Sequence, residues 1–363
     1  MDVILLGAGV SGLSAGLELA RRGIRVTLLD RGSLGGESTW AGAGILFPLL
    51  PWQYGEDFNR LALASLAHYP DWIAFLRSLS QTDPEYIASG LLVLPPVGEG
   101  AEAWCATHGF RCSPAPEDMP GLTSPPPPGS LWLPQVAHVR NPRLARALAE
   151  AIRALGGHIE DNVAIEDIAL QDSRLLSVRA GGKIYEADNF VLATGAWSRL
   201  PLANLPALPA IRPVRGQMLL YPPGSHRLQQ IIYQDGFYLV PRKDGHLLAG
   251  STLEFAGYAK EADEETRQRL HRRASNLLGG LPEPIRHWAG IRPGSPDNLP
   301  IIGPHPDFAN LYLNVGHFRY GVTLAPTSAR LLADQMTGAV PELPTAPYSL
   351  NAALARTWPE PGV

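Results

Sequence analysis

The chain has 363 residues, of which 45% are hydrophobic and 18% charged, and its formal net charge is −4. This length suits two domains or one large domain with an elaborated half, and the composition is that of a globular protein. A weakly acidic chain lacks the basic surface that nucleic acid requires, which excludes nucleic-acid partners.

Neither the cysteines nor the histidines form the pattern of a disulfide framework or a metal site. The chain has two cysteines, Cys105 and Cys112, and its histidines show no H-E-x-x-H spacing. The apolar start lacks a positively charged leader, and the apolar run at 41–52 is too short to span a bilayer. We therefore expect a cytoplasmic protein with reduced thiols, no metal and no membrane contact.

The first thirty residues predict a strand, a helix and a second strand. Residues 2–6 and 24–30 are short apolar runs, and residues 10–22 between them have helical periodicity. Together they form one βαβ unit, the building block of a nucleotide-binding sheet.

A glycine motif joins the first strand to the helix. Gly7, Gly9 and Gly12 form G-x-G-x-x-G, which permits a tight turn, close approach of a pyrophosphate and packing of the helix, whose N-terminus attracts phosphate. Asp30 ends the second strand, where it can accept hydrogen bonds from a ribose diol and would repel a 2′-phosphate. FAD or NAD therefore fits better than NADP.

The middle of the chain alternates between helices and loops. The segment 35–45 is too rich in small residues for a packed helix and suits backbone contact with a flat ring and pyrophosphate, although a surface loop is the alternative. A helix follows at 58–79. The proline-rich stretch 95–134 reads as a linker or as loops on a folded surface.

Asn141 and Pro142 are predicted to be the N-cap and first residue of a helix that stops at Gly156, followed by a strand through Val163. Another buried strand covers 190–193 and ends at Thr194 and Gly195.

Between 211 and 253 the pattern changes to short alternating runs, typical of an antiparallel sheet. A strand at 311–315 and a helix at 321–336 follow. We predict an α/β fold, α+β overall, in which a Rossmann-type FAD-binding domain (1–78, 141–205 and 296–345) carries an inserted antiparallel-sheet substrate domain (79–140 and 206–295), with a tail at 346–363.

The chain carries a single dinucleotide fingerprint. Because no second G-x-G-x-x-G occurs, the chain has no site for a pyridine nucleotide beside a flavin. If FAD is bound, its electrons must come from the substrate. The scattering of the nucleotide segments along the chain also favours FAD over NAD.

Six segments together resemble the D-amino acid oxidase superfamily, and within it the glycine oxidase branch of thiamine biosynthesis. They are GAGVSG, GGESTWAGAGILFPLLPW, ATGAWS, FYLVPRKDGHLLAGST, GIRPGSPDNLPIIGPHP and GHFRYGVTLAPTSARLLADQMTG. The resemblance implies oxidative deamination of glycine, sarcosine or D-amino acids to a 2-oxo acid, ammonia or amine, and hydrogen peroxide. It also implies a homo-oligomer and a role in thiazole formation.

The resemblance also implies the site residues. FAD, held non-covalently, would contact the glycine motif and Val10, Ser11, Asp30, Arg31, Ser38, Thr39, Ala43, Gly44, Ile45, Val163, Thr194, Gly195, His317, Phe318, Arg319, Tyr320, Gly321, Val322 and Thr323. Arg292 would clamp the substrate carboxylate, helped by Tyr238 and Arg319. Hydride transfer needs positioning more than an acid or base, so no catalytic proton carrier is named.

Other interpretations stay open on the sequence. Arg292 could pair with Asp297, Arg319 could neutralise flavin or stack at the surface, and Tyr238 could be a core residue. The chain could instead be a quinone-linked amino acid dehydrogenase, a sarcosine-type amine oxidase or a flavin-binding protein without turnover. Tyr320 and Gly236 depart from the family pattern, and Gly236 is read as leaving one pocket wall open.

Overall fold

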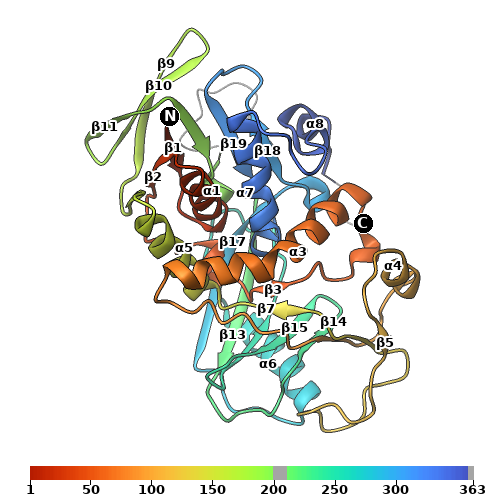
Figure 1. The fold of residues 1–363 in the computed structure, drawn as a ribbon. Helices are drawn as coiled ribbons and strands as arrows, with labels where there is room; N and C mark the ends of the chain where they lie inside the picture. Colours follow the sequence, from red (N-terminus) through yellow and green to blue (C-terminus); the bar gives the residue numbers. More distant parts are fainter. Residues whose placement is uncertain (199–210, 359–363) are drawn as a thin grey trace.

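A computed structural model describes residues 1–198 and 211–358. Two large sheets organise these residues, a six-stranded sheet in the upper half of Figure 1 and an eight-stranded sheet in the lower half. The predicted fold class, a Rossmann-type unit with an inserted sheet, is confirmed. The proposed domain boundaries stay a prediction, and the one at 205/206 and residues 359–363 lie outside the described residues.

The six-stranded sheet is the nucleotide-binding unit that the first thirty residues predict. Its order is β18-β19-β12-β1-β2-β8, and all neighbours are parallel except the edge strand β18. The strands are β1 (Asp2–Leu6), β2 (Arg25–Leu29), β8 (His158–Glu160), β12 (Asn189–Leu192), β18 (Ile301–Pro304) and β19 (Leu311–Val315). Segments hundreds of residues apart thus share one sheet.

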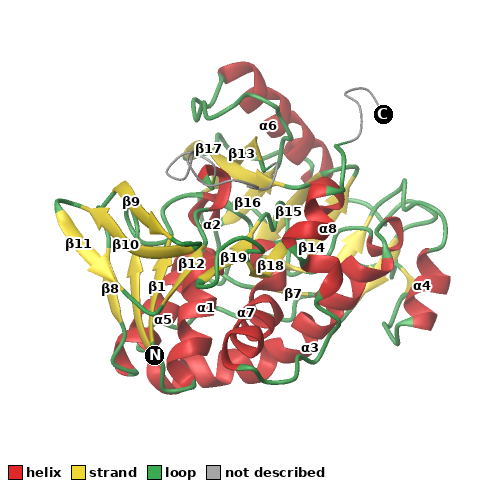
Figure 2. Ribbon diagram, turned by 90° about the horizontal axis from the view of Figure 1, so that it is seen from above, coloured by secondary structure: helices red, strands yellow, loops and turns green. Residues whose placement is uncertain are grey.

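Four helices form a layer on one face of this sheet (Figure 2). They are α1 (Val10–Arg21), α3 (Glu56–Leu79), α5 (Asn141–Ala154) and α7 (Gly321–Thr337). Leu13 and Leu17 of α1 are fully buried with Leu144 and Leu148 of α5, at the helical spacing that marks an apolar face. The other face packs against β9 (Ile165–Gln171), β10 (Arg174–Ala180) and β11 (Lys183–Glu186), a three-stranded antiparallel sheet.

The eight-stranded sheet has the order β17-β13-β16-β15-β14-β4-β6-β5. Its strands are β4 (Leu91–Val93), β5 (Ser113–Pro114), β6 (Leu131–Leu133), β13 (Arg212–Tyr221), β14 (Ile231–Gln234), β15 (Phe237–Pro241), β16 (Leu247–Gly250) and β17 (Arg286–Gly294). The expectation of an antiparallel sheet holds except between β4 and β14, which are parallel. A separate two-stranded sheet joins β3 (Ile45–Leu46) to β7 (Ala137–His138).

Alternation along β13 and β15 gives the eight-stranded sheet two different faces. Leu219 and Phe237 face α6 (Glu264–Leu278), which covers one side. Met218 and Tyr238, one residue away on the same strands, belong to the cluster on the opposite side. This second face is turned toward the nucleotide-binding unit.

Several local expectations need correction. The small-residue segment contains a four-residue helix, α2 (Ser38–Ala41), and the proline-rich stretch contains α4 (Ala101–Thr107) as well as β5 and β6. The N-cap of α5 is Arg140, because Asn141 already has helical geometry. Val163 lies beyond β8, whose last residue is Glu160.

The remaining elements are short. They are the 3₁₀ turns η1 (Pro51–Gln53), η2 (Gly195–Trp197), η3 (Pro296–Asn298) and η4 (Ala346–Tyr348), and the helix α8 (Leu350–Leu354). Tyr348 and Leu350 are buried, so the start of the predicted tail packs on the body of the protein. Across residues 1–198 and 211–358, no helix is both long and apolar enough to cross a membrane.

Candidate active site

A cavity of about 460 Å³ runs from the glycine motif to the inner face of the eight-stranded sheet. Most predicted site residues line it: Gly7, Gly9, Val10, Ser11, Asp30, Arg31, Ser38, Thr39, Ala43, Gly44, Ile45, Thr194, Gly195, Tyr238, Arg292, His317, Phe318, Arg319, Tyr320, Gly321, Val322 and Thr323. Gly12 and Val163 do not. The three-dimensional arrangement thus brings together residues from both ends of the chain.

The glycine motif makes the backbone turn tightly. Gly7 has φ +109°, and a Cβ there would lie 2.5 Å from the Ala193 carbonyl oxygen. A Cβ on Gly12 would lie 1.9 Å from the Gly7 carbonyl oxygen. Gly12 therefore packs the helix against the turn and need not touch a ligand.

Two helices point their N-termini at the cavity. The N-cap residues of α1 and α7 make no side-chain cap, neither helix has an acidic residue in its first turn, and the first residues of both line the cavity. In α1 the amide of Val10 donates to Thr39 Oγ1 (2.9 Å). The helix dipole and the remaining first-turn amides at such ends attract negative charge. The N-terminus of α1 therefore suits a pyrophosphate, and that of α7 suits an anionic ring.

Asp30 lies at the adenosine end of the cavity. Its carboxylate accepts from the backbone amides of Ala8 (2.6 Å) and Gly32 (2.9 Å), and burial raises its pKa. The Val163 amide donates to the Asp30 carbonyl (2.8 Å), so its N–H is not available to an adenine. Its neighbours Ala164 and Ile165 line the cavity instead.

A charged cluster borders the same end. The Arg31 guanidinium lies 4.0 Å from the ring centroid of Trp197, and Glu37 forms ion pairs with Arg31 and Lys260. Trp197 was not predicted as a site residue, although it belongs to the ATGAWS segment.

A buried arginine supports the segment that follows α2. Arg242 donates to the carbonyl oxygens of Ala43 (2.7 Å) and Val139 (2.9 Å). A Cβ on Gly44 would meet the Val139 carbonyl and the Asn141 side chain. Asn141 Oδ1 is buried without a partner among the described residues, although Asn141 lines the cavity. An unsatisfied acceptor beside exposed backbone fits a ring that carries N–H donors, as an isoalloxazine does.

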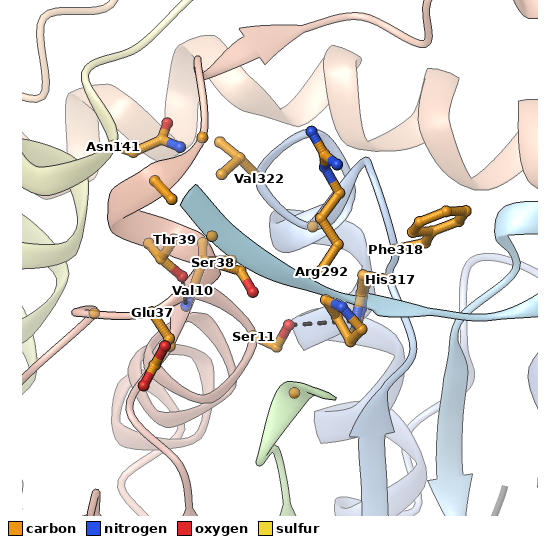
Figure 3. A pocket seen from close by; sticks show the side chains of 18 of the residues that line it. Val10, Ser11, Glu37, Ser38, Thr39, Asn141, Arg292, His317, Phe318 and Val322 are labelled. Carbon is orange, nitrogen blue, oxygen red and sulfur yellow. Dashed lines mark hydrogen bonds between the residues drawn. The ribbon is translucent and has the colours of Figure 1, made fainter. Parts of the chain in front are cut away.

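His317 is held between two hydroxyls. Its Nδ1 lies 3.3 Å from Ser11 Oγ, the contact drawn as a dashed line in Figure 3, and its Nε2 lies 3.1 Å from Ser328 Oγ. Burial lowers the pKa of His317 to about 3, so the imidazole is neutral at ordinary pH. The neutral imidazole of His317 therefore orients the Ser11 hydroxyl at the cavity wall without adding charge.

Arg292 extends from β17 into the cavity (Figure 3). Its guanidinium donates to the Thr252 carbonyl (3.0 Å), the Arg215 carbonyl (3.4 Å) and Ser251 Oγ (2.8 Å). The alternative pairing with Asp297 is absent, and Arg292 has no ion pair within the described ranges. Burial lowers its pKa below the usual range, and an anionic ligand would relieve that cost.

The strand beside β17 makes room for this guanidinium. Gly216 of β13 lies against Arg292, and a Cβ there would come within 2.2 Å of Nη1. Gly216 was not predicted as a site residue, although a glycine inside a strand indicates close approach of another group.

Replacing Gly216 with alanine is expected to displace the Arg292 guanidinium without unfolding the protein, because the clash is with the end of a flexible side chain. A shift of this kind raises KM for a carboxylate substrate by about ten- to a hundredfold. Gly55→Ala is the control, because a Cβ there meets no heavy atom within 4 Å. Steady-state kinetics with equal KM values in the two variants would contradict the placement of Arg292.

Tyr320 and Gly236, the two residues that depart from the family pattern, have different places in the structure. Tyr320 is buried and its hydroxyl lies 2.7 Å from that of Tyr54, so it forms a wall of the cavity. Gly236 does not border the cavity. It has φ +75° and closes the hairpin between β14 and β15, so the reading of an open pocket wall was wrong.

Comparison with known proteins agrees with this geometry. Residues 2–335 match the family described as FAD dependent oxidoreductase. The chain belongs to this family. It is 39% identical to a glycine oxidase of Pseudomonas aeruginosa over 96% of this chain and 98% of that protein. It is also 34% identical to the bifunctional protein ThiO/ThiG of Trichormus variabilis, of which it spans 52%.

A solved structure shares the fold over nearly the full length. The glycine oxidase of Geobacillus kaustophilus superposes with a TM-score of 0.88 at 27% identity, covering 96% of this chain and 98% of that one. The family and these relatives show that the chain is an FAD-dependent amino acid oxidoreductase, as the sequence predicted.

Proposed function

We propose that this enzyme oxidises glycine and other small amino acids or N-alkyl glycines with oxygen, releasing a 2-oxo acid, ammonia or an amine, and hydrogen peroxide. The observation that carries the proposal is Arg292, a guanidinium with no ion-pair partner among the described residues, in the cavity that the N-termini of α1 and α7 border. The curated relatives named glycine oxidase and ThiO/ThiG support a role in thiamine biosynthesis.

FAD supplies an acceptor for the two electrons that leave the amino acid. Its pyrophosphate would lie at the N-terminus of α1 beside Val10 and Ser11, its adenosine near Asp30 and its ring along Gly44, Ile45 and the first turn of α7. These assignments, like the predicted contacts, are proposals.

The chain's own groups position the substrate. Arg292 would hold the carboxylate through a charge-assisted pair, with the Tyr238 hydroxyl close beside it. Tyr238 donates to Met218 Sδ (3.5 Å), which fixes its ring against the cavity wall. The aromatic and aliphatic side chains around them, Phe47, Leu49 and Met218, exclude water from the reacting carbon. A homo-oligomer and a cytoplasmic location are proposals that rest on family resemblance.

A substrate panel with peroxide detection tests this function. The purified yellow protein is mixed with glycine, sarcosine and D-proline, first without oxygen and then in air. We expect bleaching of the flavin without oxygen and stoichiometric peroxide in air. Bleaching with dye reduction but no peroxide would instead indicate a dehydrogenase, and no bleaching with any compound would exclude turnover of amino acids.

A further inference from the structure

Arg242 is a buried cation behind one wall of the cavity. It follows β15, its side chain is buried, and it is not among the residues that line the cavity. Its guanidinium donates through Nη2 to the Ala43 carbonyl (2.7 Å) and through Nη1 to the Val139 carbonyl (2.9 Å). Because Ala43 and the next two residues line the cavity, one hydrogen bond separates this charge from the wall.

The two carbonyls that Arg242 binds belong to chain segments that also bind each other. Ile45 of β3 pairs with His138 of β7 in antiparallel register, and the Val139 amide donates to the Gly44 carbonyl (2.9 Å). Arg242 joins both segments, because the fork of donors on a guanidinium can reach two acceptors at once. The backbone along which we place the flavin ring is therefore fixed by a side chain that lies outside the cavity.

The positive charge of Arg242 has no paired carboxylate. Within residues 1–198 and 211–358 it makes no ion pair, since Glu85 and Asp244, the carboxylates that raise its pKa, pair with Arg140 at 3.6 Å and 2.6 Å. Burial has the largest effect and lowers the pKa of Arg242 to about 10. The guanidinium therefore stays protonated at ordinary pH.

The imidazole beside this guanidinium is neutral. Arg242 Nη1 donates to His138 Nδ1 (3.3 Å), and burial, together with the nearby guanidinium, lowers the pKa of His138 to about 3. His138 is buried and is not among the residues that line the cavity. A carboxylate introduced at this position would sit against Arg242 from outside the cavity.

A positive charge in this place acts on the electron affinity of a bound flavin. The oxidised ring is neutral, whereas a ring that has accepted a hydride is negatively charged, and charges near it tune its electronics. A fixed cation behind the ring, where water is excluded, stabilises the negative form more than the neutral one. The N-terminus of α7 acts in the same sense from the first turn of that helix.

We propose that Arg242 is a positioning residue for the flavin: it clamps residues 43–45 against residues 137–139 and places behind the ring a positive charge that makes reduction more favourable. The role assigned to Arg242 rests on the proposed placement of the ring along Gly44 and Ile45. It does not depend on which amine is oxidised. It also differs from the role of Arg292, which lies in the cavity and would contact the substrate.

Two measurements on the yellow holoenzyme test this role without any amine. Sulfite adds to the oxidised ring and leaves it negatively charged, so the dissociation constant of sulfite, followed by loss of visible absorbance, reports how well the site holds that charge. Reduction against a reference dye gives the two-electron midpoint potential. In Arg242→Gln we expect sulfite to bind about tenfold or more weakly and the potential to fall by about 30 mV for each tenfold.

Arg273→Gln is the matched control. Arg273 of α6 also donates to two backbone carbonyls, those of Gln234 (2.9 Å) and Asp235 (3.2 Å). It lies over the ring of Phe237, on the face of the eight-stranded sheet that is turned away from the cavity. The substitution changes the net charge equally, so the sulfite affinity and the potential should equal those of the parent protein.

A second pair of variants keeps Arg242 in place. His138→Glu sets a carboxylate beside the guanidinium and neutralises its charge, whereas His138→Gln removes the imidazole without adding charge. His138→Glu should bind sulfite about tenfold or more weakly than His138→Gln. This pair decides the question if Arg242→Gln does not retain FAD.

Equal sulfite affinity and equal potential in Arg242→Gln and the parent protein would overturn the inference and leave Arg242 as a structural clamp. Equal values in the two His138 variants would do the same. If no amine were oxidised, the proposed function would fail, while the sulfite titration and the potential would still decide the role of Arg242.

Discussion

Arg292→Met is expected to lower kcat/KM for the preferred amino acid by about two to three orders of magnitude, the cost of removing one partner of a buried charge pair. Methionine keeps a flexible, unbranched side chain that fills most of the arginine stem, and it removes the charge and the donors. Because Arg292 contacts the chain through backbone carbonyls and Ser251, the fold should persist. Steady-state kinetics with peroxide detection measure the effect.

The control for this variant is Arg286→Met, which removes an exposed arginine from the other end of β17 and changes the net charge equally. The flavin spectrum of both variants should equal that of the parent protein, because neither residue belongs to the glycine motif or to the first turn of α7. Unchanged kinetics in Arg292→Met would place the carboxylate elsewhere. A loss of bound flavin would instead show that Arg292 holds the cofactor.

Gly12→Ala should yield a protein that loses FAD and unfolds at lower temperature. A Cβ at this position would lie 1.9 Å from the Gly7 carbonyl oxygen, and neither backbone segment can move without opening the turn between β1 and α1. Gly12 does not have a positive φ, so the effect would come from the added methyl alone. Overpacking of this kind costs about 1 to 3 kcal/mol, occasionally more.

Gly16→Ala is the matched control in the same helix. A Cβ there would meet Leu28 Cδ1 at 3.0 Å and Ile152 Cδ1 at 3.5 Å, which are the ends of side chains rather than backbone. The control should stay yellow and lose only a few degrees of Tm, by about 1 kcal/mol of packing strain. Equal flavin content and equal Tm in the two variants would show that the turn is not tightly closed.

The features that could be predicted from the sequence are those whose residues lie close together in the chain. Gly7, Gly9, Gly12 and the flanking apolar runs determine a strand, a turn and a helix, because each depends on neighbours within a few residues. The change to alternating runs after residue 211 likewise indicates a sheet. Errors arose at single residues with ambiguous local roles, such as Asn141, which is a helical residue with its amide at the cavity.

The sequence by itself indicated the family, the dinucleotide site and Arg292 as the expected carboxylate-binding residue. Only the tertiary structure decided that Gly216, 76 positions away, lies under that guanidinium, that the Val163 amide is occupied by Asp30, and that Arg319 lies among tyrosines without a carboxylate. The physical reason is that burial and charge pairing depend on residues far apart in the chain, which come together only when the two sheets pack.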